Sequence, residues 1–189
     1  MNTRNSIEIT RRRFIKTLGA TALIAAPSYL SACGHLQDAG YIRNINMYSD
    51  RTDESINLDY WVNGQYVEEA LKDIDNFMRD VRTDEVKKID KREINILSAS
   101  HRLLDTDTPF ILLSGYRSRE TNEILRRRSR AVAKNSLHIR GQAADVRLNG
   151  RNIHQIANAA RSCKSGGVGK YLHSGFVHID CGSIRVWSS

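Results

Sequence analysis

Residues 1–33 have the pattern of an export signal, and this confines any stable fold to the rest of the chain. Arg11-Arg12-Arg13-Phe14-Ile15-Lys16 precedes an apolar run, residues 18–30, which Pro27 interrupts. The run is shorter than the roughly 20 apolar residues that a membrane span needs. We therefore interpret it as part of a signal and not as an anchor helix. The paired arginines followed by Phe14 and Lys16 fit a twin-arginine signal more closely than a general secretory one. The remainder of the 189-residue chain is long enough for one domain and too short for two.

The signal ends in Leu30-Ser31-Ala32-Cys33, which is typical of a lipoprotein processing site where the cysteine becomes the acylated first residue. Ordinary cleavage near the small residues, giving a protein without lipid, is the alternative. Both interpretations place the mature protein in the periplasm. We expect residues 34–40, with two glycines, to be a tether, and the domain to span residues 41–189.

Charge and cysteine content give only weak indications of a partner. The formal net charge is +8, but residues 1–33 hold five of the Lys and Arg residues and one Glu, so half of this excess leaves with the signal. The mild positive charge that remains suits an anionic polymer such as murein, or a membrane surface, without selecting either. If Cys33 carries lipid, Cys163 and Cys181 remain, and they form either a disulfide or two separate buried thiols.

Hydrophobic periodicity predicts an α+β fold with helices packed on one face of a small antiparallel sheet that carries the site. The expected helices are residues 67–81, 90–104, 118–130 and 152–163. The expected strands are residues 41–48, 56–62, 109–113, 143–148, 176–180 and 184–187, with a tight turn at Asn63-Gly64. We expect the last two strands to form an antiparallel pair about Gly182. His101 is interpreted as a core or edge histidine and not as a ligand.

His138, Asp145 and His178 can supply the three nitrogen or oxygen ligands of a catalytic zinc ion, which also needs an open position for water. Strand alternation places Asp145 and Arg147 on one face, and His178 and Asp180 on one face of another strand. Six histidines in the chain allow many such triples, so the surrounding motifs decide how much weight this set carries.

Three motifs in order resemble the zinc D-alanyl-D-alanine carboxypeptidase group, which shares its fold with hedgehog-type metallopeptidases. They are Ser114-Gly115-Tyr116-Arg117-Ser118, the stretch from Ser136 to Arg147 with its His-six-residues-Asp spacing, and Phe176-Val177-His178-Ile179-Asp180. Within that group the chain is most similar to the murein endopeptidase K subfamily, also called YcbK-like. The shared segments are residues 125–133, Gly166-Gly167-Val168-Gly169 and Arg185-Val186-Trp187.

This resemblance implies one zinc ion bound by His138, Asp145 and His178, with Arg117 facing the substrate. A guanidinium there could hold a substrate carboxylate or stabilise an oxyanion. Many relatives carry an acidic general base three residues before the last ligand, where this chain has Gly175. Asp180 and His173 are the remaining candidates for the base. Asp180 is the stronger candidate, although it could instead support a ligand N–H.

The sequence thus predicts an exported, zinc-dependent murein peptidase that hydrolyses the peptide cross-links of peptidoglycan. The alternative is a zinc-stabilised wall-binding protein of the same fold without turnover, and Gly175 in place of an acid slightly favours it. The basic run Arg126-Arg127-Arg128-Ser129-Arg130 would suggest nucleic-acid binding in a cytosolic protein. Export and the lack of interleaved aromatic residues favour a solvated helix face or a murein-facing groove instead.

Overall fold

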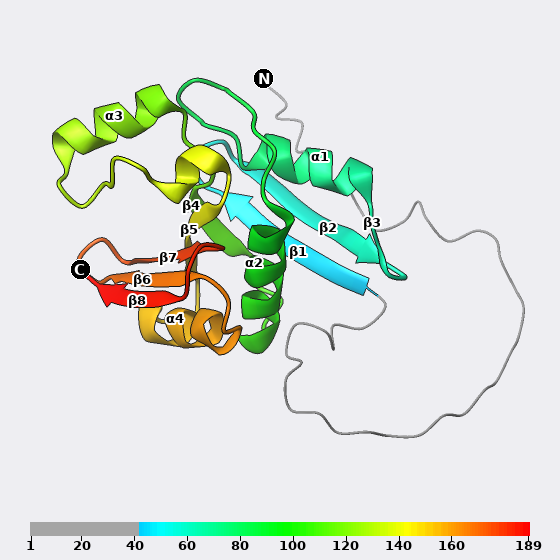
Figure 1. The fold of residues 1–189 in the computed structure, drawn as a ribbon. Helices are drawn as coiled ribbons and strands as arrows, with labels where there is room; N and C mark the ends of the chain where they lie inside the picture. The colour runs from blue at the N-terminus through cyan, green and yellow to red at the C-terminus, as the bar shows by residue number, and fades with distance from the viewer. Residues whose placement is uncertain (1–41) are drawn as a thin grey trace, which may run out of the picture.

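The computed structural model describes residues 42–189, which form one eight-stranded sheet with helices against it (Figure 1). The signal, Cys33 and the tether lie outside the described residues. The strand order across the sheet is β3-β2-β1-β4-β5-β7-β6-β8. The strands are β1 (Ile42–Ser49), β2 (Glu54–Val62), β3 (Gln65–Tyr66), β4 (Phe110–Ser114), β5 (Ala143–Leu148), β6 (Gly167–Tyr171), β7 (Phe176–Asp180) and β8 (Arg185–Ser188).

Three helices cover one face of this sheet. They are α1 (Glu68–Phe77), which contacts β2, α2 (Lys91–Leu103), which contacts β1 and β7, and α4 (Ile153–Ser162), which contacts β5, β6 and β7. Their buried apolar side chains form one core with alternate strand residues such as Val146 and Ile179. The intervening residues Asp145 and His178 therefore point to the opposite face. The predicted α+β class is confirmed, with three of the four helices of the described residues on one face of a sheet that is larger than expected and mostly antiparallel, since β1 pairs with β4, and β6 with β8, in parallel.

The remaining helices lie near the other side of the site. Helix α3 (Arg119–Arg128) stands apart from α1, α2 and α4 in Figure 1. Its N-cap is Ser118, whose side chain accepts a hydrogen bond from the Thr121 backbone N–H. A short 3₁₀ turn, η1 (Leu137–Arg140), precedes β5. No helix in residues 42–189 combines the length and hydropathy needed to span a membrane.

Two predictions about the C-terminal strands are wrong. No strand is predicted between residues 163 and 176, yet β6 lies there and pairs antiparallel with β7. Strand β8 pairs with β6 in parallel and does not form a hairpin with β7. Two of the five residues of β6 are glycines, which have low strand propensity, so its pairing is set by its neighbours and not by local sequence.

Helix α1 is also shorter than predicted. It ends at Phe77, and Val81, which continues the helical spacing, is 43% exposed. The chain turns away because the carbonyl oxygen of Met78 accepts a hydrogen bond from the Tyr116 backbone N–H. The other helices and the turn at Asn63-Gly64 lie where the sequence predicts them.

The open question about the two cysteines is decided in favour of separate thiols. Cys163 and Cys181 are both free and buried. Cys163 Sγ instead lies 3.6 Å from Ser100 Oγ.

The expected position of His101 is also found: its Nε2 lies 2.7 Å from the carbonyl oxygen of Thr108, at the edge of the core.

Candidate metal centre

Two neighbouring strands and one turn bring the three predicted ligands together. Strands β5 and β7 are antiparallel, and Asp145 is directly opposite His178 in their register. Directly opposite side chains on one face of a sheet have Cβ atoms about 4.5–5.5 Å apart. His138 reaches the same point from η1, and all three residues are buried. Residues 40 positions apart in the chain thus share one site.

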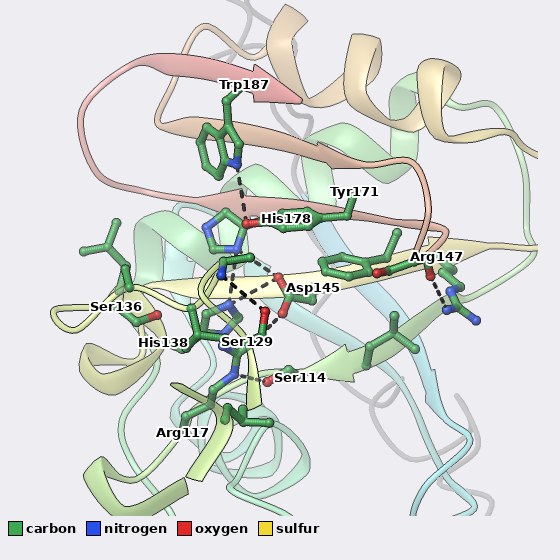
Figure 2. A pocket seen from close by; sticks show the side chains of 18 of the residues that line it. Ser114, Arg117, Ser129, Ser136, His138, Asp145, Arg147, Tyr171, His178 and Trp187 are labelled. Atoms are coloured by element: carbon green, nitrogen blue, oxygen red, sulfur yellow. Dashed lines mark hydrogen bonds and ion pairs between the residues drawn. The ribbon is translucent and has the colours of Figure 1, made fainter. Parts of the chain in front are cut away.

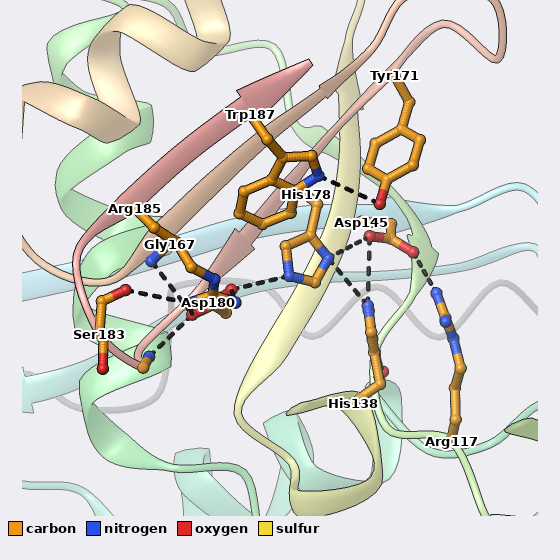
Figure 3. Close-up of polar contacts among 12 residues, drawn as sticks. Arg117, His138, Asp145, Gly167, Tyr171, His178, Asp180, Ser183, Arg185 and Trp187 are labelled. Carbon is orange, nitrogen blue, oxygen red and sulfur yellow. Dashed lines mark hydrogen bonds and ion pairs between the residues drawn. The ribbon is translucent and has the colours of Figure 1, made fainter. Parts of the chain in front are cut away.

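The three inward atoms form a triangle of the size that zinc requires (Figure 3). His138 Nε2 lies 3.2 Å from His178 Nδ1 and 3.3 Å from Asp145 Oδ1, and His178 Nδ1 lies 2.9 Å from Asp145 Oδ1. Tetrahedral zinc with bonds of about 2.0–2.1 Å places its ligand atoms roughly 3.3 Å apart. Among the described residues, this is the group of His, Cys, Asp and Glu side chains arranged to hold a metal ion.

The outward nitrogen of each histidine is held by an acceptor. His138 Nδ1 donates to the carbonyl oxygen of Gly115 at 2.7 Å, and His178 Nε2 donates to Asp180 Oδ2 at 3.0 Å. Such contacts fix the tautomer, because the proton stays on the outward nitrogen. Two nitrogen lone pairs and a carboxylate oxygen then converge on one point, an arrangement that only a bound cation or a shared proton relieves. The donor set therefore fits zinc.

The electrostatics of His138 and Asp145 agree with this interpretation. Burial lowers the pKa of His138 to about 4, although Asp145 opposes the effect. Burial also acts to lower the pKa of His178, but hydrogen bonds to Asp145 and Asp180 outweigh it and raise the pKa. Burial would raise the pKa of Asp145, yet His138, His178 and Arg117 together hold it well below its usual range. Asp145 is thus ionised and ready to bind a cation.

Arg117 binds the second oxygen of the Asp145 carboxylate. Its Nη2 donates to Asp145 Oδ2, the carboxylate oxygen that faces away from the histidines, and its Nε donates to Ser114 Oγ at 2.7 Å. Its Nη1 forms no hydrogen bond or ion pair with any of the described residues. Arg117 therefore lies beside the three candidate ligands, as predicted, and both N–H bonds of its Nη1 are left for a bound molecule.

The site opens into a pocket of about 720 Å³ (Figure 2). Three groups of residues contribute to its walls: Ser114 and Arg117, the loop after α3 that includes Ser129 and Ser136, and the aromatic residues of β6, β7 and β8. A pocket of this size is typical of small-molecule and peptide sites. The ligand atoms lie in its wall, where a bound molecule could reach them.

Comparison with known proteins assigns the family. Residues 37–187 match the family model described as peptidoglycan L,D-endopeptidase MepK. The chain belongs to the MepK family. The match covers all three motifs and all three candidate ligands, so the family resemblance expected from the sequence is confirmed.

Individual relatives cover most of the chain. Peptidoglycan L,D-endopeptidase MepK of Escherichia coli strain K12 is 40% identical over 176 residues, which are 93% of this chain and 96% of the relative. A probable peptidoglycan L,D-endopeptidase MepK of Haemophilus influenzae is 36% identical over 149 residues, which are 77% of this chain and 76% of the relative.

Asp180 and His173, the two candidates for the general base, are placed very differently in this member of the family. Asp180 is fully buried and accepts hydrogen bonds from His178 Nε2, from the backbone N–H groups of Gly167 and Gly182, and from Arg185. Burial alone would raise its pKa, but His178 and Arg185 outweigh that and lower it to about 2. His173 lies in the exposed turn between β6 and β7 and does not line the pocket.

Sequence reasoning missed the roles of Arg185 and Trp187, both on β8. In the sheet register, Gly167 lies between Asp180 and Arg185, and Gly169 lies between His178 and Trp187. A Cβ atom on Gly169 would lie 2.3 Å from Trp187 Cε2, and one on Gly167 would lie 2.6 Å from Arg185 Nη1. Both large side chains therefore lie across β6 in the space that glycine leaves. The available signal is the glycine run Gly166-Gly167-Val168-Gly169, which is one of the segments of the family resemblance but predicts no strand.

Trp187 packs against the metal centre through this gap. Its ring centroid lies 5.4 Å from that of His178, and its Nε1 donates to Tyr171 Oη at 3.4 Å. Tyr171 in turn stacks on Phe176, with ring centroids 4.5 Å apart. These aromatic side chains form one wall of the pocket beside the ligands, and Figure 2 shows Tyr171 and Trp187 directed toward His178.

Proposed function

We propose that this protein is an exported zinc-dependent peptidase that hydrolyses peptide cross-links of peptidoglycan. The observation that carries the proposal is the triangle of His138 Nε2, Asp145 Oδ1 and His178 Nδ1, with sides of 2.9–3.3 Å, in the wall of a large pocket. Membership of the MepK family supports the substrate class. The relatives are named L,D-endopeptidases, which favours the amide between an L centre and a D centre.

Arg117 and Asp180 would have different roles in this reaction. When bound, zinc supplies a Lewis acid that polarises the scissile carbonyl and activates water. Arg117 holds the outer oxygen of Asp145, and its Nη1 is free to donate to the oxygen of the scissile carbonyl as negative charge develops there. Asp180 keeps the ring of His178 in place and keeps the proton on Nε2.

For Asp180 we propose the supporting role, because it is buried and all its described contacts point to His178, Arg185 and backbone N–H groups. A general base must lie within hydrogen-bond reach of the proton that it removes. His173 is a weaker candidate, since its exposed turn gives it no contact with the ligands. The pocket wall also contains Tyr171, whose hydroxyl group lies on the side of His178 (Figure 2).

Digestion of purified murein tests the activity. The zinc-loaded protein should release soluble muropeptides, a chelator should abolish the release, and added zinc should restore it. Mass analysis of the products should show cleavage of L,D bonds and not of the D-alanyl bond. The alternative, a non-catalytic wall-binding protein, predicts that the protein sediments with murein while releasing nothing.

The proposed location rests on residues 1–33, which lie outside the described structure. The twin-arginine pattern supports export to the periplasm, and Cys33 supports a lipid anchor. Detergent partitioning of wild type and Cys33→Ser tests the anchor. Equal membrane association of the two proteins would contradict it.

A further inference from the structure

Arg147 lies on the pocket wall two residues beyond a metal ligand. Strand alternation places it on the same face of β5 as Asp145, and a rise of roughly 3.3 Å per residue puts their Cα atoms about 6–7 Å apart. Its side chain is exposed and lines the pocket. Figure 2 shows it at the edge of the pocket away from Arg117 and Ser136.

The guanidinium group of Arg147 is held in place but is not neutralised. Its Nη2 donates to the carbonyl oxygen of Ser174 at 2.7 Å. Within residues 42–189, no carboxylate forms an ion pair with it, whereas Arg117 is paired with Asp145 and Arg185 with Asp180. A neutral carbonyl contact orients the planar group and leaves its other N–H groups open to the pocket.

Gly175 explains why this guanidinium group stays open. A Cβ atom added at Gly175 would lie 3.9 Å from both Nε and Nη2 of Arg147. Any acidic side chain at position 175 would therefore start next to the guanidinium group and could pair with it. Glycine removes that partner, and the space beside Arg147 is left to a ligand.

The charge of the pocket wall supports an anionic ligand. Arg51 and Arg82 also line it without an ion pair in the described part of the chain, and Asp50 is the unpaired acid among the lining residues. With Arg117 and Arg185 already paired, the excess charge of the wall is positive. A planar guanidinium group binds a carboxylate through two parallel hydrogen bonds.

We propose that Arg147 is a specificity-determining residue that binds a free carboxylate of the substrate peptide, within about two residues of the scissile amide. The inference rests on the proposed peptidase function and deepens it. An extended peptide advances roughly 3.3–3.6 Å per residue, so the 6–7 Å between Arg147 and Asp145 corresponds to about two residues. The substrate class is therefore an acidic peptide whose carboxylate lies close to the bond that is cut.

The test compares cross-linked muropeptides in which the carboxyl groups next to the scissile amide are free or amidated. Wild type should cleave the free acid with about tenfold higher kcat/KM than the amide, the size expected for one exposed charge-assisted hydrogen bond. Arg147→Gln should lose that factor on the free acid and keep the wild-type rate on the amide. Arg161→Gln, at the exposed end of α4, is the matched control and should discriminate as wild type does.

Equal zinc content and equal thermal unfolding of the variants show that the comparison concerns binding and not folding. If Arg147→Gln still prefers the free acid tenfold, the inference is wrong. Equilibrium binding of the same two muropeptides tests the role of Arg147 separately from the proposed peptidase function. Wild type that binds the free acid tenfold more tightly but cleaves neither substrate contradicts the peptidase activity and supports the role of Arg147. Equal cleavage of both substrates by wild type supports the peptidase activity and contradicts the proposed role of Arg147.

Discussion

His178 Nε2 lies 3.0 Å from Asp180 Oδ2, on the side of the ring opposite to the nitrogen that faces the other two ligands (Figure 3). The same carboxylate accepts a hydrogen bond from Arg185 Nη2 at 2.6 Å. A metal-binding histidine held in this way keeps its ring orientation and its tautomer, and it becomes a better ligand. This relationship gives Asp180 a supporting place in the candidate metal centre that does not require it to touch the substrate.

Asp180→Asn should therefore weaken zinc affinity by about 10–100-fold, which is usual for loss of such a supporting carboxylate. His173→Ala should leave zinc affinity unchanged, because His173 lies in an exposed turn. Competition with a chromogenic chelator measures both affinities. At saturating zinc we expect Asp180→Asn to lose more of kcat than His173→Ala. A variant at position 173 that binds zinc normally but does not cleave murein would reverse the two roles.

Removing a ligand should remove the metal. His138→Ala should hold about one zinc ion fewer per chain than wild type, because two ligands and water do not make a stable zinc site. His154→Ala is the matched control, since His154 is exposed near the start of α4. Metal analysis after dialysis measures both. Equal zinc in His138→Ala and wild type would contradict the ligand assignment.

The close approach of Trp187 to β6 predicts a dependence on Gly169. Gly169→Ala puts a methyl group 2.3 Å from Trp187 Cε2, so the indole must move away from His178. Overpacking of this kind costs about 1–3 kcal/mol of unfolding free energy. The same substitution in a Trp187→Ala background should cost much less, and a double-mutant cycle by urea denaturation measures the difference. Additive effects would show that the two positions do not interact.

Glu93 predicts a pH dependence of the stability of the fold. It is fully buried in α2, and its two carboxyl oxygens have no hydrogen-bond partner among residues 42–189. Burial raises its pKa well above the usual value, with Asp180 and Asp90 adding to the effect. A raised folded-state pKa means that its contribution is fully present below the unfolded pKa of about 4.3 and is lost as pH rises.

Glu93→Gln should therefore gain stability relative to wild type above about pH 4.3, by about 1.4 kcal/mol per pH unit until the folded-state pKa is reached. Urea denaturation of both proteins between about pH 4 and pH 8 measures the gap. Taking the difference between the two proteins cancels the titration of the other carboxylates. A gap that stays constant across this range would show that Glu93 is ionised in the folded protein.

Much of the site follows from the sequence, because local pattern determines which way a strand side chain points. The alternation of residues 143–148 and 176–180 puts Asp145 and His178 on the face opposite to the apolar residues Val146 and Ile179, and the structure places them there. The caps of α3 and α4, Ser118 and Asn152, are likewise short polar side chains at the predicted helix starts.

The wall behind the ligands was decided only by the tertiary structure. Strand β6 contains Gly167 and Gly169, so it has neither strand propensity nor apolar alternation to reveal it, and it forms because β7 and β8 pair with it on both sides. That pairing lets Arg185 and Trp187 lie across the glycines and reach Asp180 and His178. Residue type and spacing specify the ligands locally, whereas contacts of side chains across a neighbouring strand leave no periodic signal in the chain.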